Sequence, residues 1–415
     1  MCANRFFNKL TFHADPSRHR LTLRGEDCDA LDARGASGSF ASHDPYGHYG
    51  AFKALARLFG TSRARLKGGV HSSRVRSAWL VPIAVSSLLG STGCGAGSPE
   101  VATASTATAP ASTSPAALSL LIEPGAGMAP IYALLDSARH SVDLVMYELE
   151  DTHAEQLLAA DAARGVAVRV LLNRSYTGSA NDAAFSYLQG HGVHVQWASS
   201  LYPLTHQKTL VVDAAVAVIM TLNWTSRYYS DTRDVGVIDR IPSDVAAIEA
   251  TFHADDAGTR IDPSPGADLV WSPTASLPDL LALINGAKHG LFVENEEMGS
   301  ADIIDALVEA ARRGVNVEIC MTDSSRWSAA FEELVSAGVH IRVYSPAAAI
   351  YIHAKVLVRD PGLGDQEAFA GSQNFSTESL RDNRELGILM TSGPPVGQLQ
   401  TLIQDDYARA SPWTG

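Results

Sequence analysis

Cysteine is scarce in this 415-residue chain, which contains only Cys2, Cys28, Cys94 and Cys320. Four cysteines at these separations give neither a disulfide framework nor the paired spacing of a zinc site. Cys320 lies in an apolar stretch and is expected to be a buried free thiol. Long apolar runs are scarce too, since the run from Ala78 to Leu89 is too short to cross a bilayer comfortably as a helix. The cysteines thus exclude a disulfide scaffold and a structural zinc site, and the apolar run does not predict a membrane-spanning helix.

Positive charge is also in short supply. The formal net charge is −13. Residues 1–93 carry 13 Lys and Arg and 6 Asp and Glu, whereas the rest of the chain carries 19 Lys and Arg and 39 Asp and Glu. Proteins that bind nucleic acid draw most of their affinity from cationic contacts with phosphates. The acidic balance therefore counts against a nonspecific nuclease, and we expect no specific nucleic-acid partner. The length suits two domains or one two-lobed unit.

What the chain does contain is a pair of short stretches that are copies of one another. Each is a His-x-Lys followed by four residues and an Asp, and each is followed by a Ser/Thr-x-Asn and, 11 positions after that Asn, by an acid. The first copy comprises His206, Lys208, Asp213, Thr221, Asn223 and Asp234. The second comprises His353, Lys355, Asp360, Ser372, Asn374 and Glu385. These residues form the candidate site.

Strand periodicity divides this set into faces. The residues around the motifs are β-branched and apolar, which predicts buried strands at 206–212 and 352–358. Side chains at i and i+2 share one face of a strand, so each His points with its Lys. Thr221 and Ser372 likewise point with their asparagines and are candidates to bind substrate. Asp213 and Asp360 complete the motif, but their odd offset suggests a turn-capping role.

A doubled His, Lys and Asn set has the groups that a phosphodiester centre needs. Two ammonium groups and two carboxamides hold the non-bridging oxygens. One neutral imidazole attacks phosphorus, and the other, protonated, gives its proton to the departing alcohol. The two histidines must then have separated pKa values, and Asp234 and Glu385 are candidates to fix their tautomers. The scheme requires no metal and no cofactor.

These paired HxKxxxxD motifs resemble the phospholipase D superfamily, over roughly Leu118 to Thr391. Two correctly spaced copies in one chain are far more specific than a single HxK. The resemblance implies that His206 is the nucleophile and His353 the general acid, and that the protein hydrolyses the distal phosphodiester of a phospholipid. In the second copy Gly371 precedes the serine, as is usual in that family, whereas Met220 takes this place in the first.

Three alternatives remain open at this stage. A transphosphatidylase similar to cardiolipin synthase differs only in the acceptor that reaches the phosphohistidine. An endonuclease outside the cytoplasm would need a local basic groove. An inactive, phosphate-binding scaffold would retain the motif without turnover.

The amino-terminal part has the pattern of an exported protein. Residues 1–69 show little apolar periodicity and are assigned as a disordered or misassigned extension. Residues 70–94 combine basic residues, a short apolar run and small residues before Cys94, which is typical of a signal peptide with a lipoprotein processing site. Residues 95–117 are Ala, Ser, Thr and Pro-rich and are expected to be a tether. We therefore expect a monomeric lipoprotein, anchored to the membrane surface through Cys94 on the extracytoplasmic side, or a secreted protein. The alternative is a cytoplasmic amino-terminal extension with an apolar helix.

The rest of the chain is an internal repeat. Residues 131–172 align without gaps to residues 280–321, and each half alternates helix and strand. This alternation predicts two α/β sandwich halves with mixed, mostly parallel sheets, at 118–262 and 263–410, related by a pseudo-twofold axis with the site at their interface.

Two further groups of side chains bear on substrate choice. One is an acidic cluster at a strand end and the other an aromatic group after the first Asn. Their members are Glu294, Glu296, Glu297, Trp224, Tyr228 and Tyr229, with Phe375 as the repeat counterpart of Trp224. Carboxylates and aromatic faces hold cationic headgroups, but a solvated strand end and core packing explain them equally well.

Overall fold

The computed structural model describes residues 116–415 apart from residues 176 and 178. The predictions for the extension, the signal peptide and Cys94 lie outside the described residues, as does nearly all of the tether. No helix within the described range is long and apolar enough to traverse a bilayer.

The first half opens with a strand at Leu118 and ends with a long helix. Its elements, in chain order, are β1 Leu118–Glu123, α2 Ala129–Ser137, β2 Ser141–Met146, β3 Leu149–Glu150, α3 Thr152–Ala163, β4 Ala167–Leu172, α4 Asp182–Gly190, β5 His194–Trp197, β6 Thr209–Val212, β7 Val216–Met220, β8 Trp224–Thr225, β9 Thr232–Asp239 and α5 Pro242–Asp256.

The second half repeats this order and ends with a longer helix. Its elements are β10 Leu269–Ser272, α6 Ser276–Asn285, β11 Gly290–Glu294, α7 Ala301–Arg312, β12 Asn316–Thr322, α8 Ser328–Ser336, β13 His340–Tyr344, β14 Tyr351–Ile352, β15 Val356–Arg359, β16 Glu367–Gly371, α9 Thr377–Arg381, β17 Glu385–Met390, α10 Pro394–Arg409 and β18 Ser411–Pro412.

Each half is built on one large mixed sheet. The strand order is β1-β9-β7-β6-β2-β4-β5 in the first and β10-β17-β16-β15-β11-β12-β13-β18 in the second. Only β2-β4-β5 and β11-β12-β13 pair in parallel within these orders, because the motif strands connect to their neighbours by hairpins. The predicted pair of α/β halves is confirmed, with more antiparallel pairing than the alternation of helix and strand indicates.

The same local signals shape corresponding helices in the two halves. Asp151 and Ser300 are the N-caps of α3 and α7, and their side chains accept backbone N–H bonds from the first turn. Both helices are followed by a glycine with positive φ, Gly165 at 88° and Gly314 at 89°, a conformation that other residues adopt at a cost. The internal repeat therefore carries its own helix start and stop signals.

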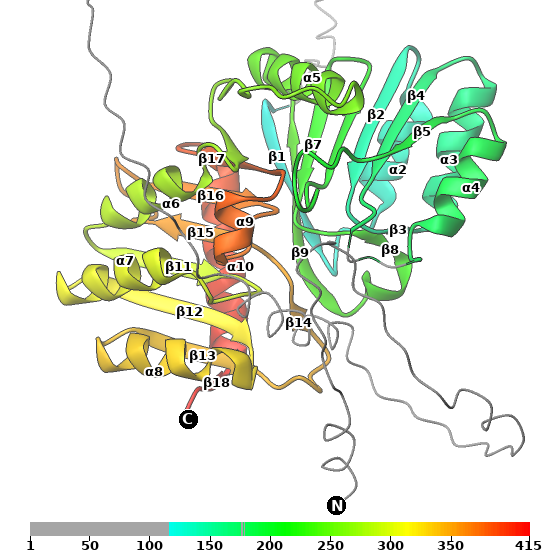
Figure 1. Cartoon of the computed structure of the whole chain (residues 1–415). Helices are drawn as coiled ribbons and strands as arrows, with labels where there is room; N and C mark the ends of the chain where they lie inside the picture. Colours follow the sequence, from blue (N-terminus) through cyan, green and yellow to red (C-terminus); the bar gives the residue numbers. More distant parts are fainter. Residues whose placement is uncertain (1–115, 176, 178) are drawn as a thin grey trace, which may run out of the picture. The chain divides into compact units, whose positions relative to one another are not determined.

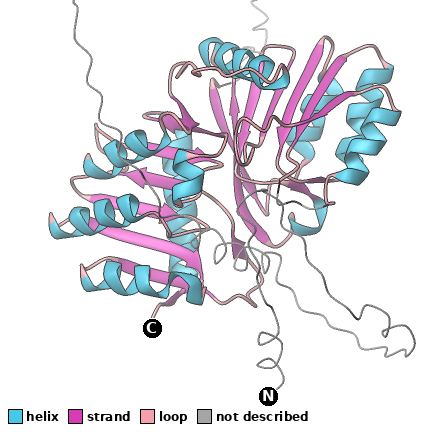
Figure 2. Ribbon diagram, in the orientation of Figure 1, coloured by secondary structure: helices cyan, strands magenta, loops and turns pink. Residues whose placement is uncertain are grey.

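Helices cover the two sheets on opposite sides of the junction (Figures 1 and 2). Buried apolar side chains of α2, α3 and α4 pack on the first sheet, and those of α6, α7 and α8 on the second. A third apolar cluster contains residues of β7, β9 and α5 together with residues of β10, β15, β16, β17 and α10. The halves thus share a core between their inner faces.

Reciprocal contacts cross this junction. β14 pairs in parallel with β9, and an isolated bridge joins Thr205 to Arg384 at the corresponding place in the repeat. Arg233 of the first half pairs with Asp406 on α10, at 2.5 Å, and Arg384 of the second pairs with Asp255 on α5, at 2.9 Å. Each half therefore holds the final helix of the other through a buried ion pair.

Candidate active site

Both HxK segments lie at the junction and use their backbones to bridge it. The N–H of His206 donates to the carbonyl of Arg384 at 3.0 Å, and that of His353 donates to the carbonyl of Arg233 at 3.1 Å. Each histidine therefore precedes the regular pairing of β6 or β15, although the sequence predicts that the strands include it. The ladder begins later because the preceding amides bond to the other half instead of to a neighbouring strand.

Each histidine is held by an acid from the opposite half. His206 Nδ1 lies 2.9 Å from Glu385 Oε2, and His353 Nδ1 lies 2.7 Å from Asp234 Oδ1. The histidines are 8% and 6% exposed. A carboxylate at Nδ1 assigns the ring proton to that nitrogen and leaves Nε2 available for chemistry. Neither half contains a complete histidine site by itself.

The two acids are charged in spite of their burial. Burial acts to raise the pKa of Asp234, but His353 and Lys355 outweigh it, and the pKa lies below its ordinary value. The pKa of Glu385 is likewise lowered, because His206 and Lys208 outweigh burial. Ser379, which sequence reasoning missed, donates to Glu385 Oε1 at 2.6 Å. Ser379 belongs to no repeated motif, and a single serine in a short helix does not by itself indicate a site.

The environment of His206 keeps its imidazole neutral. Burial, followed by the charge of Lys208, lowers the pKa of His206 to about 4, against the opposing effect of Glu385. A neutral imidazole with its proton on Nδ1 has a lone pair on Nε2, as a nucleophile requires.

Both lysines are buried beside their histidines. Lys208 is 1% exposed and Lys355 is fully buried. Lys208 Nζ donates to the carbonyl of His206 at 2.7 Å and lies 5.0 Å from the ring centroid of Tyr147. Burial and the charge of Lys355 lower the pKa of Lys208 to about 7. Two buried ammonium groups close enough to repel one another form a strong anion site.

The two asparagines have free hydrogen-bonding capacity. Asn223 is 9% exposed, and the carboxamide oxygens of Asn223 and Asn374 are buried without a partner in the described part of the chain. An amide group carries two donors and two acceptor sites. These oxygens can accept a hydrogen bond from a ligand, whereas the predicted contact with non-bridging oxygens falls to the amide nitrogens and stays a prediction.

Comparison with known families agrees with this geometry. The family model described as "Cardiolipin synthase, PLD-like domain" matches residues 131–255 and 280–407, which together exceed half of the chain. The chain belongs to the phospholipase D superfamily. The two matched segments correspond to the two halves of the fold.

Individual relatives of this member of the superfamily are distant. Cardiolipin synthase A of Pseudomonas putida (strain W619) is 24% identical over 338 residues, which cover 71% of this chain and 69% of that protein. The structure of phosphatidylserine synthase from Haemophilus influenzae Rd KW20 matches with a TM-score of 0.56 at 11% identity, over 72% of this chain and 87% of its own. The structure of polyphosphate kinase from Porphyromonas gingivalis matches with a TM-score of 0.54 at 14% identity. The match covers 70% of this chain and 50% of that kinase, so this chain spans half of the kinase. At these identities the solved structures show a shared fold alone.

Two residues assigned to substrate binding lie behind the site. Thr221 and Ser372 are fully buried. The hydroxyl of Thr221 donates to Asp234 at 2.6 Å, and that of Ser372 accepts the N–H of Leu386 at 3.2 Å. Their hydroxyls bond to the strands that carry the acids, and their contact with substrate stays a prediction.

The aspartates that close the two motifs bind backbone N–H groups of neighbouring turns. Asp213 accepts backbone N–H bonds from three successive residues, Arg139 to Ser141, and Asp360 does the same from Lys288 to Gly290. Both adopt positive φ, 53° and 43°. Their carboxylates fix the turn between α2 and β2, or α6 and β11, against the end of the motif strand, so within the candidate site they have the turn-capping role that their odd offset predicts.

The acidic cluster does not act as one group. Glu294 is fully buried, and burial together with Asp406 raises its pKa well above the ordinary value. Glu297 faces Arg326 at 3.6 Å. Glu296 alone reaches the motif residues. Trp224 and Phe375 are 0% and 1% exposed and pack in the two cores, as the structural interpretation expects.

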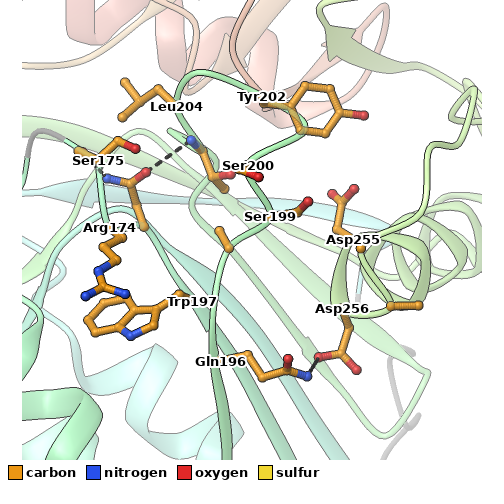
Figure 3. Close-up of a pocket in the computed structure, with 15 residues that line it drawn as sticks. Arg174, Ser175, Gln196, Trp197, Ser199, Ser200, Tyr202, Leu204, Asp255 and Asp256 are labelled. Carbon is orange, nitrogen blue, oxygen red and sulfur yellow. Dashed lines mark hydrogen bonds between the residues drawn. The ribbon is translucent and has the colours of Figure 1, made fainter. Parts of the chain in front are cut away.

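A polar pocket of about 560 Å³ lies beside the first HxK segment. Its lining includes Thr205, one residue before His206, but none of the HxK side chains. Figure 3 shows Arg174 against the indole of Trp197, with its guanidinium 5.2 Å from the ring centroid. No sequence motif predicts this pocket, because its residues come from three separate segments, 173–175, 196–205 and 255–258.

Proposed function

We propose that this protein transfers a phosphatidyl group from a phospholipid to an alcohol, through a phosphohistidine on His206. The observation that carries the proposal is the pair of imidazoles at one junction, each bound to an acid of the other half, with one held neutral between buried lysines. Similarity to cardiolipin synthase A supports transfer over hydrolysis, which the motifs alone do not distinguish.

In the first step, His206 Nε2 attacks phosphorus. A P–N bond forms, the P–O bond to the headgroup breaks, and His353 gives its Nε2 proton to the departing oxygen. Lys208, Lys355 and the two carboxamides hold the non-bridging oxygens while charge develops on them. Glu385 stabilises the histidine cation that the attack creates.

In the second step, His353 takes the proton of an incoming hydroxyl. The new P–O bond forms as the P–N bond breaks, and His206 returns to its neutral form. Water as the acceptor gives hydrolysis, and an alcohol gives transfer. The two histidines are only 8% and 6% exposed, which limits the access of water to the intermediate and favours an acceptor that binds.

A lipid anchor at Cys94 belongs to the same proposal, since it would keep the site beside its phospholipid substrate. Replacing that cysteine, as Cys94→Ser, should then move the protein from the membrane fraction to the soluble fraction. A variant that stays in the membrane fraction contradicts the anchor.

The experiment uses the full chain on phospholipid vesicles with a graded concentration of glycerol. We expect the phosphatidyl-alcohol product to exceed phosphatidic acid at millimolar acceptor, and both products to disappear in His206→Ala. Phosphatidic acid as the sole product at every acceptor concentration would assign hydrolysis. Turnover that survives in His206→Ala would overturn the mechanism.

A further inference from the structure

The carboxylate of Glu296 lies against the two side chains of the second HxK pair, His353 and Lys355. Glu296 Oε2 lies 3.0 Å from Lys355 Nζ and 3.5 Å from His353 Nε2, and its other oxygen accepts the hydroxyl of Tyr351 at 3.2 Å. The Glu296 side chain is 9% exposed. The Lys355 ammonium group and His353 Nε2 therefore already have a carboxylate beside them when no ligand is bound.

The first half has no carboxylate in this place. In the repeat alignment, at an offset of 149, the residue that corresponds to Glu296 is Tyr147. Its ring lies edge-on to His206, with centroids 4.6 Å apart, and under Lys208 Nζ. An aromatic ring covers the first pair without neutralising it.

Phosphate and carboxylate oxygens compete for the same donors. His353 Nε2 and Lys355 Nζ are the groups that the proposed reaction places against the leaving-group oxygen and a non-bridging oxygen. A carboxylate oxygen within 3.5 Å of both occupies the space that these oxygens need. Substrate and Glu296 cannot hold these donors together.

We propose that Glu296 is a resident anion that occupies the phosphate position of the second half in the free protein and that every substrate must displace. The inference rests on the phosphate-binding role of the HxK pairs under the proposed function. Glu296 thereby makes the two half-sites unequal. The first pair lies against the ring of Tyr147 and holds no carboxylate at this position, whereas the second becomes available only when the phosphate takes over the contacts of the carboxylate. This order of engagement favours attack by His206.

Phosphate affinity tests the inference without a lipid substrate. Inorganic phosphate is titrated into the full chain by calorimetry, for the wild type, Glu296→Gln and Glu297→Gln. The last is the matched control, because it removes the same charge one residue away, where the carboxylate faces Arg326. We expect Glu296→Gln to lower the dissociation constant for phosphate by about tenfold or more, which corresponds to one strong competing contact, and Glu297→Gln to leave it within about twofold.

Kinetics on vesicles provide a second readout. Without the competing carboxylate, Glu296→Gln should lower KM for the phospholipid by a larger factor than it changes kcat, since the lost contact is made in the free protein. A merely structural role predicts a loss of folded protein and no gain in affinity.

Tyr351→Phe keeps the inference testable if Glu296→Gln does not fold. It retains the carboxylate but removes the hydroxyl that holds its second oxygen, and we expect phosphate to bind about two- to threefold more tightly. Phosphate affinity that is the same in the wild type and in both variants at residues 296 and 351 overturns the inference. Absence of phosphate binding in all of them would overturn the proposed function as well, whereas lipid turnover lost in His206→Ala supports that function independently.

Discussion

The two HxK pairs of this protein have the same residues and the same register, yet they lie in different surroundings. His206 and Lys208 meet the ring of Tyr147, while His353 and Lys355 meet the carboxylate of Glu296. The skeleton around them is symmetric, because each histidine takes its acid and its backbone acceptor from the other half. One difference at a strand end thus gives the two copies of the repeat different charged surroundings.

The difference acts through charge. His206 has one carboxylate neighbour and two ammonium groups nearby, and its pKa falls to about 4 through burial and Lys208. His353 lies between two carboxylates, Asp234 and Glu296. Carboxylate oxygens therefore face both ring nitrogens of this second histidine. The first histidine is thus suited to attack and the second to donate a proton.

The largest expected effect separates these two roles. His206→Ala should lower kcat by about 10⁴-fold or more on every substrate, because no nucleophile remains. His353→Ala should lower kcat comparably on phospholipids but retain most of the formation rate of phosphohistidine on a p-nitrophenyl phosphodiester, whose leaving group needs no proton. Mass spectrometry of acid-labile phosphate on His206 is the measurement. Equal losses on the activated substrate would contradict the division of roles.

The next effect concerns the ion pairs that hold the halves together. Asp255→Ala leaves Arg384, 1% exposed, without its carboxylate, and Asp406→Ala does the same to Arg233. Each should lower the free energy of unfolding by about 3–5 kcal/mol, since a buried guanidinium loses its partner. Denaturant unfolding measures this loss.

Asp405, an exposed carboxylate on the same helix as Asp406, provides the control. Asp405 lies 3.8 Å from Arg409 and is 62% exposed, so Asp405→Ala should change stability by less than about 0.5 kcal/mol. A large loss for one buried pair and none for the other would show that the halves are not held symmetrically.

The sequence alone predicts the skeleton of this site. Repetition of His, Lys, Asn and a following acid at constant spacing requires a common geometry, and the structure brings these side chains to one junction. It also places Asp213 and Asp360 at turns, as their odd offset suggests. Period and spacing predict which face a residue takes on its own strand, since the backbone fixes that locally.

What lies across the junction could not be predicted in the same way. Glu296 and Tyr147 occupy matching positions but belong to different chemical classes, so the repeat gives no pattern to recognise. The ion pairs of Arg233 and Arg384 depend on two final helices about 130 to 170 residues away along the chain. Thr221 shares a face with Asn223 but donates to Asp234 on the neighbouring strand β9. Such contacts follow from how the halves dock.

The smallest expected effect is on the pH dependence of kcat/KM, which reports the free protein. The nucleophile must be neutral, and the pKa of His206 is about 4, so activity should persist as pH falls and decline only below about pH 4. Lys208 must be charged, and burial with Lys355 lowers its pKa to about 7. Activity should therefore fall as pH rises through about 7, by up to about tenfold per unit.

The alkaline limb gives the comparison its sharpest test. Lys208→Arg carries a charge that persists to far higher pH, so the limb near pH 7 should disappear, whatever the height of the profile. Lys288→Arg, at an exposed lysine 67% accessible beside Asp365, should leave the limb in place. A limb that survives Lys208→Arg would assign it to a different group, and the pH dependence would then not arise from the buried lysine over the Tyr147 ring.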